Sequence, residues 1–216
     1  MEIRERGYMK RNILDRDQTC PDGMVFTEDE SYLLCRYEEK DRKLYDKIWE
    51  ETFGQSPVLN DTELKIKLWQ DVLFDKNKLQ LKIIHKKTGN YVGEVMVMNL
   101  DSEMPELGIQ ILKEYQGKGI GSRIMKNFID QLKSILPVEA FLVKISSDNH
   151  ISRKLFENMG AVQIGEEGKE YGELFKKAME DMGKEVFEKS VTSDVGIFQR
   201  YIICYKIEAR GGNGRQ

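Results

Sequence analysis

The feature that most constrains the fold is a strand, a glycine-rich turn, a helix and a second strand that follow one another between residues 105 and 146. PELGIQI at 105–111 and AFLVKIS at 140–146 are short runs rich in β-forming residues. Between them, a helical stripe of apolar side chains comprises Ile120, Ile124, Phe128, Ile129, Leu132 and Ile135. Because neighbouring strands that are joined through a helix run parallel, this segment predicts one parallel crossover.

Antiparallel pairing is predicted before the crossover. The segment 79–100 alternates apolar and polar residues on either side of Thr88-Gly89-Asn90, which is a strong signal for a β-hairpin. SYLLCRY at 31–37 is predicted as the first strand. Apolar spacings of three and four then predict two amphipathic helices, over 44–53 and 64–73.

After the crossover we expect a short helix, a strand at 161–166, a helix and a last strand at 198–207. The inserted amphipathic helix, 169–189, is interpreted first as packed on the sheet; a lid over a substrate and a homodimer contact are the alternatives. The predicted fold is α/β (α+β), with a mixed, mostly antiparallel sheet flanked by helices and an extra helix between the last two strands.

The 216 residues are enough for one domain. We expect an N-terminal arm or a peripheral hairpin over 1–28, in which charged residues surround a Pro-Asp-Gly turn. A domain over 29–208 and a flexible tail over 209–216 are expected to follow.

Composition argues against several functional classes. The 34 Lys and Arg nearly balance the 37 Asp and Glu, so the chain as a whole has no field that favours nucleic acid or a membrane surface. Three cysteines without a paired spacing and two histidines leave little support for a metal site. No secretory leader or membrane-length apolar run is found in the sequence, so a cytoplasmic location is expected.

The turn YQGKGIGSRIM is the strongest candidate for a binding site. Gly117, Gly119 and Gly121 at the start of a helix let consecutive backbone N–H groups face one anion, and a pyrophosphate suits such a site. Lys118 and Arg123 lie beside the turn and can add positive charge. Walker and protein kinase patterns do not fit the segment. A Rossmann dinucleotide site would need glycine at position 122 and is the distant second choice.

The pattern resembles the acyl-CoA loop of the GNAT superfamily of N-acetyltransferases, Q/R-x-x-G-x-G/A, with Gln116, Gly119 and Gly121 in the matching positions. NHISRKLFENMGA at 149–161 is similar to a second segment of the family, and the order of elements agrees from about residue 32 to 161. ELGIQILKEYQGKG looks most like the branch that modifies protein amino termini.

The resemblance implies that acetyl-CoA is the acyl donor and that an amine is the acceptor; no metal is expected. Asn149 would contact the cofactor, although a helix cap also explains it. The positions implied to bind the cofactor are Ile109, Gln110, Ile111, Gln116, Gly117, Lys118, Gly119, Ile120, Gly121, Ser122 and Asn149.

For catalysis, the resemblance makes Glu106 the candidate base and Glu94 the reserve, against the common alternative of a solvated charge on a strand. Phe156 stands where many relatives have a tyrosine that protonates the leaving thiolate; Tyr171, Tyr201 or Tyr205 could replace it. The predicted function is acetyl transfer to a primary amine by direct attack on the thioester. A catalytically silent acyl-CoA-binding protein and a dinucleotide-binding protein are the alternatives, and the acceptor stays open.

Overall fold

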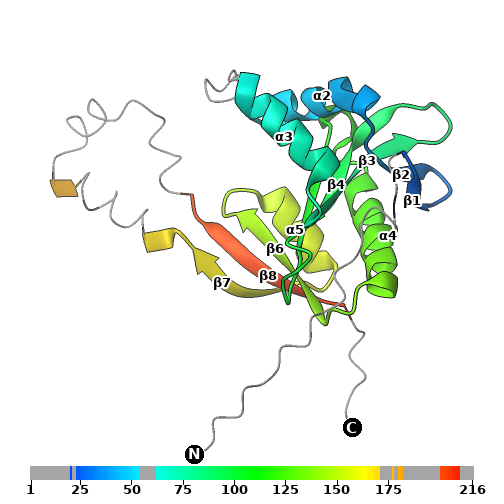
Figure 1. The fold of residues 1–216 in the computed structure, drawn as a ribbon. Coiled ribbons are helices and arrows are strands. Elements are labelled where there is room, and N and C mark those ends of the chain that lie inside the picture. Colours follow the sequence, from blue (N-terminus) through cyan, green and yellow to red (C-terminus); the bar gives the residue numbers. More distant parts are fainter. Residues whose placement is uncertain are drawn as a thin grey trace, which may run out of the picture.

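The computed structural model describes residue 20 and residues 23–53, 62–170, 177, 180–181 and 200–209 (Figure 1). Its strands are β1 (Val25–Glu28), β2 (Tyr32–Arg36), β3 (Lys78–His85), β4 (Tyr91–Met98), β5 (Glu106–Ile111), β6 (Ala140–Ser146), β7 (Val162–Glu167) and β8 (Ile202–Glu208). Its helices are α2 (Arg42–Phe53), α3 (Thr62–Phe74), α4 (Ile120–Ile135) and α5 (His150–Asn158), with 3-10 turns η1 (Glu39–Asp41) and η3 (Lys113–Tyr115).

The strands form one eight-stranded sheet in the order β1-β2-β3-β4-β5-β6-β8-β7. Every neighbouring pair is antiparallel except β5 and β6. The predicted hairpin is β3–β4, whose turn places Gly89 at a φ of 70°. The predicted crossover is β5-α4-β6. The mixed, mostly antiparallel sheet is therefore confirmed, and a sheet with one parallel pair does not fit the parallel dinucleotide-binding fold.

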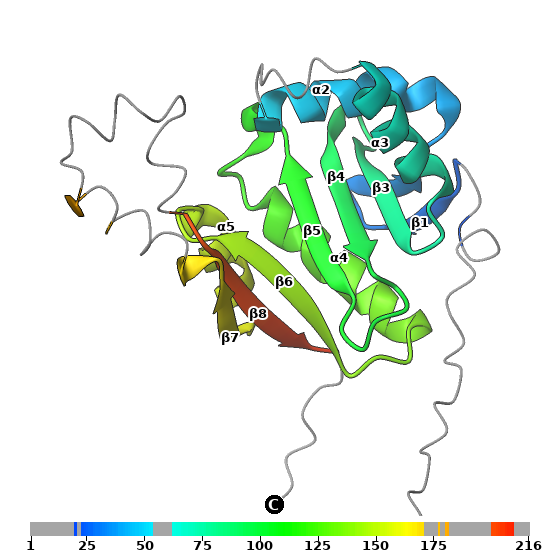
Figure 2. The same cartoon turned by 60° about the vertical axis from the view of Figure 1, so that its left-hand side comes forward.

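The larger core lies between the sheet and α4. The buried stripe of this helix consists of Ile120, Ile124, Met125, Phe128, Ile129 and Leu132. It packs with apolar side chains of the sheet such as Leu107, Phe141 and Val143 in one cluster. Figure 2 shows α4 and α5 behind the sheet and α3 on its opposite face. Burying one Leu or Phe side chain contributes about 1.5–3 kcal/mol, so this layer is a major source of stability.

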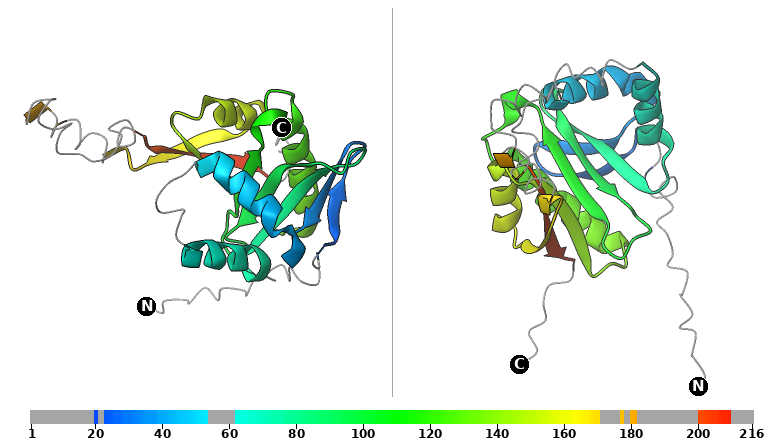
Figure 3. Two further views of the ribbon diagram at one scale, coloured as in Figure 1. Left: turned by 90° about the horizontal axis from the view of Figure 1, so that it is seen from above. Right: turned by 90° about the vertical axis from the view of Figure 1, so that its left-hand side faces the viewer.

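A second, aromatic core lies under α2 and α3. Tyr37 after β2, Tyr45 on α2 and Trp69 on α3 are buried in it together. The rings of Tyr37 and Trp69 meet edge to face, with centroids 5.8 Å apart. Figure 3 shows both helices over the β2–β5 half of the sheet. The two predicted helices are thus present, and their apolar stripes hold them to the sheet.

The structure describes the end of the segment that was expected to form an arm or a peripheral hairpin. β1 begins at Val25, pairs with β2 and brings Phe26 into edge contact with Phe128, with ring centroids 5.9 Å apart. Four residues are too few to show a period in the sequence, so the pairing partner decides this strand.

Other sequence predictions fall largely outside the described residues. The inserted helix 169–189 does so, and so does the tail beyond Ala209. The N–H of Ala209 itself donates to the carbonyl of Glu139 at 2.8 Å. Among the described helices, none is long and apolar enough to cross a membrane.

Candidate active site

The glycine-rich turn opens α4 with unpaired amides. Gly117 and Gly119 have φ values of 72° and 74°, a left-handed conformation that glycine adopts without strain. Gly119 is the N-cap of α4 and offers no side chain, so the amides of Ile120, Gly121 and Ser122 lack partners within the helix. This arrangement, together with the helix dipole, is suited to binding an anion.

Next to this turn, β5 and β6 separate. They pair only at Glu106 with Leu142 and at Leu107 with Val143. The rest of β5, residues 108–111, pairs with β4 but not with β6, so one edge of its backbone is free. Gly93 allows this close β4–β5 contact, because a Cβ there would come within 2.2 Å of the carbonyl oxygen of Gln110.

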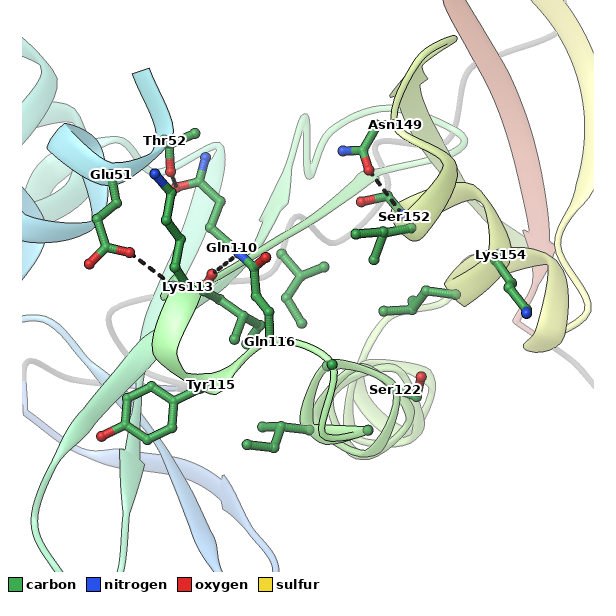
Figure 4. A pocket seen from close by; sticks show the side chains of 18 of the residues that line it. Glu51, Thr52, Gln110, Lys113, Tyr115, Gln116, Ser122, Asn149, Ser152 and Lys154 are labelled. Carbon is green, nitrogen blue, oxygen red and sulfur yellow. Dashed lines mark hydrogen bonds between the residues drawn. The ribbon is translucent and has the colours of Figure 1, made fainter. Parts of the chain in front are cut away.

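A cavity of about 780 Å³ joins the free edge of β5 to the start of α4. Its volume lies within the usual range for ligand sites, roughly 300–1,000 Å³. Figure 4 shows its walls: Glu51 and Thr52 of α2, Gln110 of β5 and Lys113 of η3 on one side, and Asn149, just before α5, and Lys154 of α5 on the other. The lining residues thus come from α2, β5, η3, the start of α4 and α5.

Ten of the eleven residues predicted to bind the cofactor line this cavity: Ile109, Gln110, Ile111, Gln116, Gly117, Gly119, Ile120, Gly121, Ser122 and Asn149. Lys118 does not. Its Nζ donates to the carbonyl of Glu114 at 2.7 Å and lies 5.6 Å from the centroid of the Tyr115 ring. The Lys118 side chain is held along its own turn, so it does not face a ligand in the cavity.

Arg123, the other cation beside the turn, is also engaged elsewhere. Its Nε lies 2.7 Å from a carboxylate oxygen of Asp29, and its guanidinium lies 5.8 Å from the centroid of the Tyr32 ring. Burial raises the pKa of Asp29, but hydrogen bonds from the N–H groups of Ser31 and Tyr32 and the hydrogen bond and positive charge of Arg123 lower it further, so the pKa lies below its usual value. Arg123 therefore ties α4 to the β1–β2 turn.

Asn149 has two roles in this geometry. Its Oδ1 accepts a hydrogen bond from the N–H of Ser152 at 3.0 Å, which makes it the N-cap of α5. The cap uses the oxygen, so only the Nδ2 group of this side chain remains as a donor toward the cavity. The two interpretations of Asn149 are thus compatible.

Several lining residues were not predicted. They are Glu51, Thr52, Lys113, Tyr115, Ile151, Ser152, Lys154, Leu155 and Asn158. Those on α5 recur at helical spacing after Asn149, a signal that could have found them. Ile151 is apolar but 75% exposed, and it lies beside the cavity. For Glu51 and Thr52, the local sequence gives no signal that they line a cavity.

Glu106 lies where β5 still pairs with β6, outside the cavity lining. No hydrogen bond or close ion pair joins its half-buried carboxyl to another described residue. Burial raises the pKa of Glu106, the ammonium of Lys144 lowers it and the carboxylate of Glu167 raises it. Lys144 is bound to Glu167, with Nζ 2.9 Å from the carboxylate oxygen. An unpaired carboxyl with a raised pKa has the properties of a general base.

Glu94 is placed very differently. It is 1% exposed, under α2 and α3, and its carboxylate accepts a hydrogen bond from the hydroxyl of Tyr37 at 2.8 Å. The hydroxyl of Tyr91 lies 2.8 Å from that of Tyr37 and extends the chain of bonds. Burial raises the pKa of Glu94, while hydrogen bonds with Gln80 and Tyr37 lower it. It does not line the cavity.

Of the tyrosines proposed to replace the missing acid, the two that the structure describes, Tyr201 and Tyr205, do not line the cavity. Phe156 is 2% exposed in the main core. The hydroxyl of Tyr205 donates to Glu157 at 2.9 Å and accepts from Nε of Arg153 at 3.2 Å. Tyr201 lies outside the lining, and Tyr171 lies outside the described residues. The lining tyrosine is Tyr115, in η3 just after β5.

Metal ligands are not gathered in the part of the chain that the structure describes: no group of three or more His, Cys, Asp or Glu side chains there could hold an ion.

The comparison with protein families identifies the class of protein that this fold and cavity define. The sequence profile of the acetyltransferase (GNAT) domain matches residues 33–162. This chain therefore belongs to the GNAT acetyltransferase family and is an acyltransferase. A comparison with curated proteins gave no match.

Solved structures agree with this fold. A chimera of spermidine N-acetyltransferase SpeG from Vibrio cholerae and hSSAT is 17% identical, with a TM-score of 0.62 over 82% of this chain and 95% of that one. SpeG from Vibrio cholerae with manganese ions is 16% identical, with a TM-score of 0.59 over 83% and 93%. A probable acetyltransferase is 18% identical, with a TM-score of 0.58 over 83% and 94%. At such identities the likeness establishes the fold.

Proposed function

We propose that this chain transfers the acetyl group of acetyl-CoA to a primary amine by direct attack of the amine on the thioester. The observation that carries the proposal is the cavity lined both by the free amides at the start of α4 and by the free edge of β5. A long ligand with a pyrophosphate at one end and amide groups along its arm matches these two surfaces.

The proposed base is Glu106. A primary amine carries a proton near neutral pH, so a base must remove it before the nitrogen lone pair can attack the thioester carbon. The new C–N bond then forms as the C–S bond breaks, and the thiolate leaves. The raised pKa of Glu106 and its lack of a close partner support this role. Glu94 stays the reserve, although its carboxylate is already engaged by Tyr37.

The leaving thiolate needs little help, because a thiol ionises far more readily than an alcohol or amine. This supports turnover with Phe156 at the position of the expected acid. A catalytically silent protein is the contrasting hypothesis and rests on Phe156 alone.

The acceptor is tested first among polyamines, because the names of the SpeG neighbours specify spermidine. A peptide with a free amino terminus is second, from the resemblance of the segment 106–119 to enzymes of that kind. Thiol release from acetyl-CoA, with mass spectrometry of the product, would be measured for these amines, lysine, an aminoglycoside and small metabolic amines. Coenzyme A binding without turnover across the whole panel would contradict the proposal.

The base assignment is tested with Glu106→Gln and Glu94→Gln. We expect Glu106→Gln to lower kcat by roughly 10²–10⁴-fold with unchanged affinity for coenzyme A. Loss of kcat in Glu94→Gln alone, with Glu106→Gln active, would move the role to Glu94.

A further inference from the structure

The positive charge that a phosphorylated ligand could bind does not come from the two cations beside the glycine turn, as the sequence suggested. Lys118 and Arg123 flank the glycine turn but are bound to Glu114 and Asp29, and neither lines the cavity. The described cations that do line it are Lys113 and Lys154. They lie on opposite sides, Lys113 beside α2 and Lys154 on α5 (Figure 4).

Coenzyme A presents two separate phosphate groups: a pyrophosphate and a monoester at the 3′ position of its ribose. The amides at the start of α4 can bind the first of these, because they form one anion site at one helix end. A phosphate monoester carries about −1.5 to −2 charges near neutral pH. It therefore calls for a further cation, distinct from the glycine turn.

Lys154 has the placement for that cation. It follows Ile151 by three residues and precedes Asn158 by four, and all three line the cavity, so this stripe of α5 faces it. Figure 4 shows Lys154 on the same side of the cavity as Ser122 of α4. No hydrogen bond or ion pair joins Lys154 to another described residue, which leaves its ammonium group available within that part of the chain.

Lys113 suits a dianion less well. Its own N–H donates to a carboxylate oxygen of Glu51 at 2.9 Å, and Glu51 also lines the cavity. The negative charge of Glu51 would repel a phosphate monoester on that side.

We propose that Lys154 binds the 3′-phosphate of coenzyme A, so that this chain selects coenzyme A over dephospho-coenzyme A, which lacks that group. The proposal rests on the proposed function insofar as coenzyme A is the cofactor. It makes Lys154 a determinant of cofactor specificity on α5, outside the glycine turn.

Calorimetric titration of both ligands into wild type, Lys154→Met and Lys126→Met tests this. Lys126 is an exposed lysine of α4 outside the cavity lining, so Lys126→Met controls for net charge. We expect wild type and Lys126→Met to bind coenzyme A roughly tenfold more tightly than dephospho-coenzyme A. Lys154→Met should lose this preference, with its affinity for dephospho-coenzyme A unchanged.

The outcomes separate this proposal from the proposed function. If wild type binds neither ligand, the proposed function fails. If wild type binds both equally, or if Lys154→Met keeps the preference, the role of Lys154 is wrong while coenzyme A binding stands. If Lys154→Met weakens both ligands equally, Lys154 contacts the pyrophosphate and the 3′ assignment is overturned.

Discussion

At the scale of residues, the glycines of the turn serve different needs. At Gly119 an added Cβ would meet nothing within 4 Å, yet the φ of 74° disfavours other residues. Gly119 is thus required by backbone conformation and by the approach of an anion. At Gly121 an added Cβ would lie 3.2 Å from a side-chain carbon of Leu155, so that glycine is required by packing of α4 against α5.

We predict that Gly119→Asp abolishes measurable coenzyme A binding in calorimetry, because a carboxylate at the N-cap would repel the phosphates. Gly89→Asp is the matched control: Gly89 has a φ of 70° and open space in the β3–β4 turn, away from the cavity. Both variants should lose about 1–2 kcal/mol of stability through the left-handed conformation. Retained affinity in Gly119→Asp would show that the turn was misinterpreted.

A second prediction separates the two roles of Asn149. Asn149→Ala removes both the cap and the Nδ2 donor, so it should lose about 1 kcal/mol of unfolding free energy together with affinity for coenzyme A. Asn149→Asp keeps the cap oxygen but not the donor, so it should keep stability and lose affinity. Chemical denaturation and calorimetry on the same samples measure both. Full affinity in Asn149→Asp would reduce Asn149 to a helix cap.

At the scale of elements, the separation of β5 from β6 creates the cavity, and the neighbouring strands set the charge around Glu106. Lys144 of β6 reaches Glu167 of β7 across the intervening strand β8. This ion pair engages the ammonium group of Lys144, the positive charge that lowers the pKa of Glu106. Cys204 of β8, which lies opposite Lys144 of β6, is a further titratable neighbour, and it interacts with both Glu106 and Glu167.

We therefore predict that Glu167→Gln shifts the acidic limb of kcat/KM to lower pH. A base acts when deprotonated, so activity falls as the pH drops through the raised pKa of Glu106. Removing Glu167 removes a charge that raises this pKa and frees Lys144, which lowers it. Glu166→Gln is the control, because Glu166 pairs with Lys169 at 2.8 Å instead. An unchanged limb in Glu167→Gln would contradict the role of this pair.

At the scale of the whole molecule, the cavity is where the layers meet. Its lining comes from α2 on one face of the sheet, from β5 within it, and from α4 and α5 on the other face. A ligand that binds only the folded chain stabilises all of these elements together.

Coenzyme A at one hundred times its Kd should raise unfolding free energy by about 2.7 kcal/mol. For a chain of this size, that corresponds to roughly 5–11 °C in Tm. Calorimetric melting with and without ligand measures the shift, and a nicotinamide dinucleotide should give none. A shift in Tm with the dinucleotide but not with coenzyme A would contradict the proposal that this chain binds coenzyme A.

Much of the fold was predictable because each helix or strand requires apolar residues at a characteristic spacing in the sequence. The α4 stripe and the β3–β4 hairpin are examples, each with a local turn or cap that marks its ends. For β1 the sequence left an arm and a peripheral hairpin open, because four residues carry no period and the pairing with β2 comes from the tertiary structure. Glu51 and Thr52 were missed for a similar reason, since they reach the cavity from a helix about sixty residues before the glycine turn.

The sequence by itself determined the conformation of the glycine turn and the order of strand, helix and strand around it, because backbone dihedral preferences and apolar periodicity act locally. The tertiary structure alone decided which charges face the cavity. Lys118 and Arg123 adjoin the turn but bind elsewhere, whereas Lys154 comes to line the cavity from α5. Long charged side chains pair with the groups that lie near them in space, and those groups come together only once the sheet has formed.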